Sequence, residues 1–324
     1  MLIPCLLATA VFAADEKSKD PAPTKPKPVA ETFTDVAKAG PDYRDQGEYK
    51  NDWGGAQVIA LGDDKFRMVT YKGGLPGDGW DKEFKQEING KREADGKIAF
   101  TSTNNYRAEL AAGKITINTD AGGPWTMEKV SRHSPTEGAK PPIGALVLFD
   151  GTSVDAWQGG HTDERHLLAA GPKTKQQFTN YSMHCEFLLP FKPLGRGQDR
   201  GNSGVYMQDR YEVQVLDSFG LKGENNECGG IYTLLKPAVN MCYPPLTWQT
   251  YDIDFTAAKH DDSGKKVKNA VITVKHNGVL IHDHAEIKGS TGGGKKEDPS
   301  GGAIQLQGHG NPVFYRNVWI VPKA

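Results

Sequence analysis

The chain has 324 residues, enough for two ordinary domains, and combines 37% hydrophobic residues with 38 glycines and 20 prolines. This composition favours short strands joined by many tight turns over long helices. Thirty-nine Lys and Arg face 40 Asp and Glu, which leaves a formal net charge of −1. No basic stripe runs along the sequence, so neither nucleic acid nor an anionic membrane surface is predicted as a partner.

The first 13 residues, MLIPCLLATAVFA, form an apolar run of the length found in secretory signal peptides. Val11 and Ala13 occupy the small-residue positions of a cleavage site. A membrane-spanning helix needs roughly 20 apolar residues, so no membrane span is predicted. We expect a signal peptide over 1–13 and export to the periplasm or the cell exterior, with lipid anchoring through Cys5 as the minor alternative. Residues 14–30 are charged and Pro-rich, which predicts a disordered tether.

Residues 31–132 contain short β-like runs separated by turn clusters such as GGLPGDGW and NGKREADGK. They predict a small all-β roll or barrel, for which the sequence suggests no function. The β-like runs lie at 56–61, 66–71, 98–103 and 114–118. Residues 133–144 are polar and rich in Pro and Gly, and predict a linker between two domains.

Residues 145–324 contain nine further short strand patterns and no convincing amphipathic helix, which predicts a two-sheet antiparallel sandwich. Asn277-Gly278 is typical of a tight hairpin turn, and the glycine-rich run 288–302 predicts a flexible surface loop. Three cysteines remain beyond the signal peptide. Cys228 and Cys242 are the local choice for a disulfide in an exported protein, whereas Cys185 fits a buried thiol. The strand patterns lie at 146–149, 181–189, 204–208, 211–216, 249–255, 270–275, 279–282, 303–307 and 313–321.

The segment YEVQVLD, residues 211–217, carries the most informative pattern. Because side chains alternate along a strand, Tyr211, Val213 and Val215 share an apolar face and Glu212 and Gln214 share the other. Residues 303–309 repeat the pattern, with three polar side chains on one face: Gln305, Gln307 and His309. The plain alternative is that both polar faces are solvated outer surfaces. Carboxamides and carboxylates, however, suit the paired hydroxyls of a sugar, so a carbohydrate-binding face is the competing interpretation.

A series of motifs in the second half resembles the 3-keto-disaccharide hydrolase family, formerly a domain of unknown function. The resemblance covers about 146–323 and implies a concanavalin-like jelly roll with a carbohydrate substrate. Two departures, Gln249 where Asn is usual and Tyr315 inside the usual FRN triplet, leave the substrate range open. The motifs are LFDGTSVDAW (148–157), NSGVYMQ (202–208), YEVQVLDS (211–218), GGIY (229–232), a strand with Trp248, HNG (276–278) and IQLQGHGNPVFYRNVWI (304–320).

The resemblance implies cleavage of a 3-keto-glycoside by removal of the C2 proton and departure of the group on C1. Glu212 and His309 are the candidates for proton transfer, and Tyr232 for stacking or acid catalysis. Glu212 has a structural alternative, an ion pair with an inward-pointing Arg316, for which Glu186 or Asp217 would serve equally well. The candidates for substrate binding are Asn202, Ser203, Gln214, Asp217, Trp248, Gln305, Gln307 and Arg316.

No cofactor is established by the sequence, although a divalent cation would polarise the ketone. His282 and His284 share a predicted strand face, but a histidine pair at a strand end is more often an exposed polar end. Two rival functions remain beside the hydrolase or lyase. One is a non-catalytic, lectin-like carbohydrate-binding module, and the other is a cell-surface adhesion protein.

Overall fold

The computed structural model describes residues 31–102, 106–120 and 122–323. The predicted signal peptide, the tether and Cys5 lie outside the described residues. Within the described ranges, no helix has the length and apolar character needed to cross a membrane.

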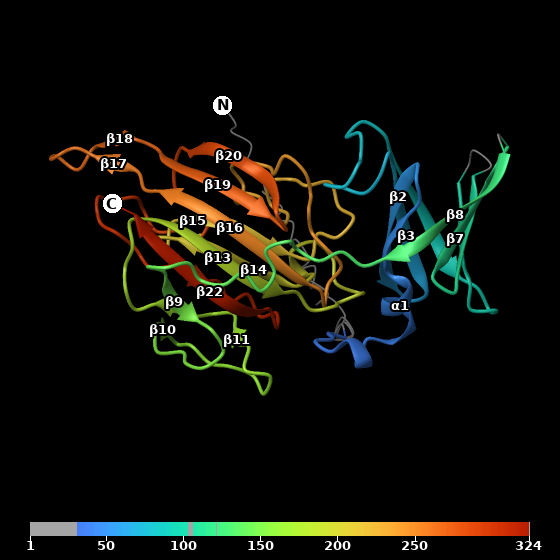
Figure 1. Cartoon of the computed structure of the whole chain (residues 1–324), viewed down its shortest axis with the longest axis horizontal. Coiled ribbons are helices and arrows are strands. Elements are labelled where there is room, and N and C mark those ends of the chain that lie inside the picture. Colours follow the sequence, from blue (N-terminus) through green and yellow to red (C-terminus); the bar gives the residue numbers. More distant parts are fainter. Residues whose placement is uncertain (1–30, 103–105, 121, 324) are drawn as a thin grey trace, which may run out of the picture.

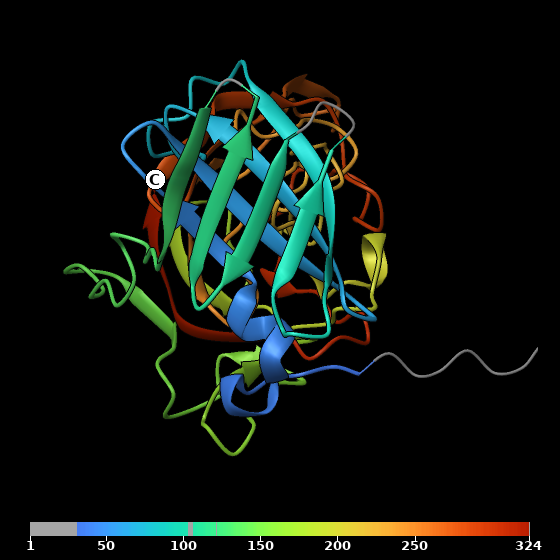
Figure 2. The same cartoon turned by 90° about the vertical axis from the view of Figure 1, so that its right-hand side faces the viewer.

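Eight antiparallel strands close into a barrel in the first half of the chain (Figure 2). A 3-10 turn (η1, Val36–Lys38) and a short helix (α1, Gly40–Asp45) precede it. The closure is made by β1 against β8, where Tyr49 faces Lys129. The predicted small barrel is therefore confirmed. Its strands are β1 (Gly47–Lys50), β2 (Gly54–Gly62), β3 (Lys65–Lys72), β4 (Lys85–Arg92), β5 (Ile98–Thr101), β6 (Arg107–Ala111), β7 (Lys114–Thr119) and β8 (Gly122–Val130).

Strand β4 was not predicted, because its sequence KQEINGKR contains an Asn-Gly pair typical of a turn. In the structure Gly90 pairs with Phe100 of the neighbouring strand. A Cβ at position 90 would lie 2.4 Å from the Phe100 ring, so glycine is needed there for the close approach of that ring. Strands β1, β6 and β8 were also missed, since their sequences are short or mostly polar.

Two antiparallel sheets stack face to face in the second half, and this confirms the predicted sandwich (Figure 1). The five-stranded sheet contains β10 (Trp157–Gln158), β12 (Lys173–Thr174), β21 (Gln305–Leu306), β14 (Asn202–Met207) and β15 (Tyr211–Leu216), in that order. The seven-stranded sheet contains β11 (Leu168–Ala169), β22 (Phe314–Lys323), β13 (Asn180–Leu188), β16 (Trp248–Thr256), β19 (Ala270–His276) and β20 (Val279–Ile287), with β9 (Leu146–Phe149) pairing to β22. A small hairpin of β17 (Lys259–His260) and β18 (Lys266–Lys268) stands apart.

The sandwich core lies between the two sheets and takes one side chain in two from each central strand. Tyr211, Val213 and Val215 are buried in it, as the alternation predicts. Asn277 and Gly278 both have positive φ and form the predicted hairpin turn between β19 and β20. The three described cysteines, Cys185, Cys228 and Cys242, are free thiols and buried. Cys228 and Cys242 are thus not joined as a disulfide in this structure.

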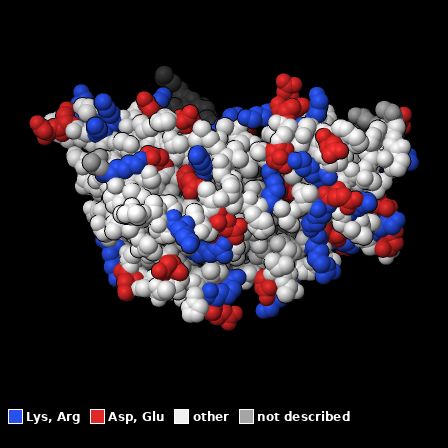
Figure 3. Space-filling model, viewed as in Figure 1, with Lys and Arg blue, Asp and Glu red and all other residues white. Residues whose placement is uncertain are grey.

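The barrel packs on the sandwich through the outward-facing side chains of β2 and β3. Ile59, Val69 and Tyr71 form a small apolar cluster with Phe219 of the sandwich. Arg132, just after β8, binds Glu48 of the barrel at 2.5 Å. Acidic and basic side chains are interspersed over the face of the molecule seen in Figure 3, in keeping with the near-zero net charge.

The segment between β8 and β9 lies against the outer face of the seven-stranded sheet. The Ser134 hydroxyl is 2.6 Å from the hydroxyl of Thr250. The main-chain N–H of Gly138 donates to Glu186 at 2.6 Å. Pro135 packs so closely on the β19–β20 turn that a Cβ on Gly278 would lie 2.4 Å from it. The segment is therefore held by the sandwich from Ser134 to Gly138.

Val213 tests the assignment of the core face. Val213→Ala should lower the free energy of unfolding by about 1–3 kcal/mol, because it removes fully buried methyl groups. Denaturant unfolding of the full chain measures the change. Val267→Ala on the β17–β18 hairpin is the matched control, since Val267 is 57% exposed and should change stability by less than about 0.5 kcal/mol. Equal effects of the two substitutions would contradict the packing described here.

Candidate functional site

The outer face of the five-stranded sheet brings together the polar residues of three strands. Tyr206 of β14 lies opposite Glu212 of β15 and also opposite Gln305 of β21. The main-chain N–H of Gln307 donates to Gly204 O at 2.8 Å, which places Gln307 beside Gly204. Gln305 and Gln307 therefore share the face of Glu212, as predicted.

Glu212 lies in the middle of this face and is buried, with 1% of its surface exposed. Its side chain crosses over β14, and a Cβ on Gly204 would lie 2.2 Å from Glu212 Oε1. Burial raises the pKa of Glu212 to about 7, and a hydrogen bond from Tyr206 opposes that rise. A carboxyl group with this pKa is populated in both protonation states near neutral pH, which suits it to accept and return a proton.

The Tyr206 hydroxyl has two acceptors within reach and one proton to donate. It lies 2.7 Å from Glu212 Oε2 and 2.7 Å from the carbonyl oxygen of Gly292. When Glu212 is ionised, Tyr206 donates to it. When Glu212 is protonated, Tyr206 can accept from the carboxyl and donate to Gly292 instead. Tyr206 thus stabilises both states of the carboxyl group.

Three carboxamides, those of Asn202, Gln214 and Gln307, share the sheet face of the carboxyl group. Gln198 Oε1, from the 3-10 turn η2 (Gly197–Asp199), accepts from Asn202 Nδ2 at 3.0 Å and from Gln214 Nε2 at 3.2 Å. The side-chain carbonyl oxygens of Asn202, Gln214 and Gln307 are buried and have no hydrogen-bond partner among the described residues. Unpaired buried acceptors are unfavourable unless a donor arrives, and sugar hydroxyls are such donors.

Two loops cover the edge of this face. The main-chain N–H of Tyr232 donates to Glu212 O at 3.1 Å, and a Cβ on Gly292 would lie 3.1 Å from the Tyr232 ring. The hydroxyl of Thr291 accepts from Glu212 N at 2.9 Å. The expectation of a surface loop over 288–302 is therefore wrong for this part of it, because Thr291 is buried against β15 and Gly292 borders the carboxyl group.

Ser203 and Asp217, both expected to bind substrate, do not lie on this face. Ser203 points to the core side of β14, with its hydroxyl 2.6 Å from Gln307 O and 2.8 Å from the Tyr315 hydroxyl. Asp217 lies just past the end of β15 and is fully buried, and its Oδ2 binds Arg200 Nε at 2.8 Å. Its partner explains its burial without a ligand.

Arg316 and Trp248, also expected in the site, lie on the outer face of the other sheet. The Arg316 guanidinium stacks 3.9 Å from the centre of the Trp248 ring and binds Glu186 at 2.7 Å. The alternative partner Glu186 is therefore the one used, and an ion pair of Glu212 with Arg316 is ruled out. The alternation along β22 breaks at Asn317, which has φ 46° in a bulge, so Arg316 points outward.

The histidines expected to take part are spread apart. The His309 ring is exposed, and the residue accepts a hydrogen bond from Asn311 through its main-chain oxygen. His282 is buried with Nε2 2.7 Å from Gly229 O, whereas the side chain of His284 is 84% exposed, so the two do not share a face. Across the described ranges, no three His, Cys, Asp or Glu side chains gather where they could ligate a metal ion.

Four residues that shape this site are not among the predicted site residues. Tyr206 alternates with core residues and was available from the pattern, but its pairing with Glu212 depends on strand register. Gly204 owes its role to the side chain that lies over it. Gln198 and Thr291 lie outside the strands, where no periodicity indicates which way a side chain points.

Gly204 gives a direct test of the carboxyl position. Its φ is not in the left-handed region, so alanine is opposed there only by Glu212. Gly204→Ala should destabilise the protein by about 1–3 kcal/mol through overpacking. In a Glu212→Ala background the same substitution should have an effect near zero or a stabilising one. A double-mutant cycle by denaturant unfolding measures the coupling, and additive effects would contradict the placement of Glu212 over Gly204.

Comparison with known proteins identifies the family of the second half. The sequence profile described as a 3-keto-alpha-glucoside-1,2-lyase-like domain matches residues 144–321, which is more than half of the chain. The match begins after the barrel ends. A search of the curated proteins finds no match.

Two crystal structures from Parabacteroides distasonis, both of proposed glycosyl hydrolases, are similar to this chain. The first is 33% identical with a TM-score of 0.52, and the alignment covers 56% of this chain and 85% of that one. The second is 18% identical with a TM-score of 0.40 over 56% of this chain and 94% of that one, too distant to bear on function. With the profile match across its sandwich, the chain belongs to the family of 3-keto-alpha-glucoside-1,2-lyase-like domains, a family of carbohydrate-active enzymes.

Proposed function

We propose that the protein cleaves 3-keto-glycosides on the outer face of the five-stranded sheet, with Glu212 as the proton-transfer group. One observation carries the proposal. A buried carboxyl group with a pKa of about 7 shares its sheet face with three carboxamides whose oxygens have no partner within the described part of the chain. The family contributes the substrate class, a sugar derivative with a ketone at C3.

The reaction follows from the acidity that a C3 ketone gives to the proton on C2. Ionised Glu212 takes that proton, and the electrons of the C–H bond form a double bond between C1 and C2. The bond from C1 to the leaving oxygen breaks, and that oxygen takes up a proton. Addition of water across the double bond then returns a 3-keto sugar. The atoms balance as net hydrolysis without the oxocarbenium route of ordinary glycosidases.

The surrounding residues have separate tasks in this scheme. The Tyr206 hydroxyl stabilises Glu212 in either protonation state. The carbonyl oxygens of Asn202, Gln214 and Gln307 accept from sugar hydroxyls and orient the ring. Tyr232 borders the site and is placed to stack on the sugar or to supply the proton to the leaving group. His309 stays a candidate for that second proton transfer, from its exposed position two residues beyond Gln307.

A lectin-like role is the second candidate, because the unpartnered carboxamide oxygens fit hydroxyl donors whether or not a bond is broken. The raised pKa of Glu212 favours the enzyme, since binding alone requires no group that titrates near neutrality.

Glu212→Gln separates catalysis from binding. Glutamine keeps the shape but cannot accept a proton, so turnover of a 3-keto-glycoside panel should fall ~100-fold or more while sugar binding persists. In the unsubstituted protein kcat/KM should rise with pH towards a plateau above about pH 7, as Glu212 ionises. Mass spectrometry of the products measures turnover.

Glu186→Gln is the matched control, because it removes a carboxylate from the opposite face, where it binds Arg316. It should lower the melting temperature and leave the turnover of folded protein unchanged. Near-normal turnover in Glu212→Gln would remove Glu212 from the mechanism, and sugar binding without turnover in any form would favour the lectin.

The raised pKa also predicts how stability depends on pH. The folded state holds the Glu212 proton up to about pH 7, whereas the unfolded chain releases it near the ordinary glutamate pKa of 4.5. Stability from this group is thus complete below pH 4.5 and is lost as the pH rises through 7. The unfolding free energy of Glu212→Gln, relative to that of the unsubstituted protein, should therefore increase by on the order of 1–3 kcal/mol between pH 5 and pH 8. Parallel curves of unfolding free energy against pH for the two proteins would contradict the raised pKa.

A further inference from the structure

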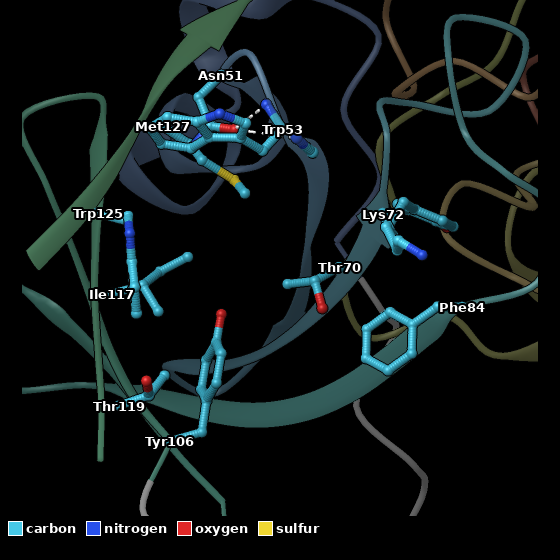
Figure 4. A pocket seen from close by; sticks show the side chains of 12 residues that line it. Asn51, Trp53, Thr70, Lys72, Phe84, Tyr106, Ile117, Thr119, Trp125 and Met127 are labelled. Carbon is cyan, nitrogen blue, oxygen red and sulfur yellow. Dashed lines mark hydrogen bonds between the residues drawn. The ribbon is translucent and has the colours of Figure 1, made fainter. Parts of the chain in front are cut away.

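The barrel is filled at one end and hollow at the other. Large buried side chains, among them Phe66, Met68 and Phe100, pack the interior away from the opening. At the open end a cavity of about 480 Å3 remains (Figure 4). Its walls come from the β1–β2 turn, β3, Phe84, Tyr106 and the paired strands β7 and β8. A cavity of this size in an eight-stranded barrel is enough for one small molecule.

Aromatic side chains dominate the opening. Trp53 is 67% exposed and Phe84 is 52% exposed, and they are the two aromatic residues in the described part of the chain with exposed side chains. Trp125 lies deeper, beside Ile117 on the wall formed by β7 and β8. Large apolar groups left in water on a monomer mark a binding site more often than chance.

The backbone holds both exposed rings in place. The main-chain N–H of Trp53 donates to Asn51 Oδ1 at 3.0 Å, and Gly73 N–H donates to Trp53 O at 2.8 Å. Phe84 follows a turn in which Asp81 Oδ1 accepts from Phe84 N at 3.0 Å. The opening is therefore preformed, so ligand binding carries no free-energy cost for ordering these two segments.

Several polar side chains of the lining are already used. The Thr119 hydroxyl donates to Gly122 O at 3.3 Å and the Tyr71 hydroxyl to Gln57 Oε1 at 2.8 Å. The polar side chains of the described lining are those of Asn51, Thr70, Tyr71, Lys72, Tyr106 and Thr119. Asn51, the carboxamide at the rim, donates from Nδ2 to Thr126 O, and its Oδ1 accepts from Trp53 N–H and Gly54 N–H. The Tyr106 hydroxyl points into the cavity without a hydrogen-bond partner among the described residues. Lys72 is the charged lining residue, and it lies at the rim, 72% exposed and 3.6 Å from Asp81.

We infer that the barrel cavity binds a small, neutral, largely apolar ring compound carrying a hydroxyl or carbonyl group that pairs with Tyr106. A sugar is disfavoured, because sugar recognition needs several free planar polar side chains and Asn51, the one carboxamide among the described lining residues, is occupied. A charged ligand is disfavoured, because the one charged side chain of the described lining, Lys72, lies at the rim beside Asp81. This site lies outside the residues matched by the family profile and does not depend on the proposed function of the sandwich.

The test uses the full chain and the neutral fluorophore N-phenyl-1-naphthylamine, whose emission rises when it enters an apolar site. Saturable enhancement with one site per chain is expected. The double substitution Trp53→Ala and Phe84→Ala should weaken binding about 10-fold or more, because both anchors are lost. Phe314→Ala, a partly buried aromatic residue on the sandwich, is the matched control and should leave binding unchanged.

The role of Tyr106 is tested by competition. 4-tert-Butylphenol should displace the fluorophore about 2- to 10-fold better than tert-butylbenzene, because one compound has the hydroxyl and the other does not. Tyr106→Phe should abolish that preference while leaving tert-butylbenzene unaffected. Absence of saturable enhancement, or enhancement that survives loss of Trp53 and Phe84, would overturn the site. Displacement by a neutral oligosaccharide at lower concentration than by 4-tert-butylphenol would overturn the ligand class in favour of carbohydrate.

Discussion

The buried ion pair between Arg200 and Asp217 joins the two segments that shape the candidate site and lies against the end of barrel strand β2. Arg200 Nε lies 2.8 Å from Asp217 Oδ2, with side chains 7% and 0% exposed. Removing one partner of such a pair leaves an unpaired buried charge, at a cost of about 3–5 kcal/mol. Asp217 terminates the strand that carries Glu212, and Arg200 terminates the turn that carries Gln198. The pair therefore holds the strand of Glu212 and its neighbouring turn at a set distance.

The barrel takes part in this arrangement through its own main chain. Both Nη atoms of Arg200 lie 3.4 Å from Ala60 O, and Arg196 donates to Leu61 O at 2.6 Å. Gln198 lies between these two arginines in the sequence. Its Oε1 accepts from the amide nitrogens of Asn202 and Gln214, which leaves the oxygens of those carboxamides without a partner among the described residues. The end of β2 thus supports one wall of the proposed sugar-binding face. The barrel therefore contributes to the geometry of the site through main-chain oxygens, and these contacts involve none of its side chains.

Alternation and motif order were enough to predict the sandwich and the face of Glu212, because both depend on local sequence alone. Val213 in the core and Gln214 opposite it follow directly from a period of two. The same rule failed at Arg316, where the bulge at Asn317 inverts the phase of the strand. A different rule, that Asn-Gly marks a turn, failed at Gly90, where glycine makes room for Phe100 within a strand. Gln198 and Thr291 could not be predicted from the sequence, because their roles arise from contacts between segments distant in the sequence.

The segment after β8 has a consequence for how such proteins are assembled from modules in evolution. Its two halves belong to different domains, since Arg132 binds Glu48 of the barrel and Ser134 binds Thr250 of the sandwich. Glu186 is buried, yet hydrogen bonds from His184, Asn317, Arg316 and Gly138 lower its pKa to about 2. A gene fusion joined at residue 144, where the family likeness starts, would remove Gly138 and deprive this carboxylate of one donor. The joint that preserves the hydrogen bonds of both domains falls at His133, so a recombined sandwich must inherit the polar segment in front of it.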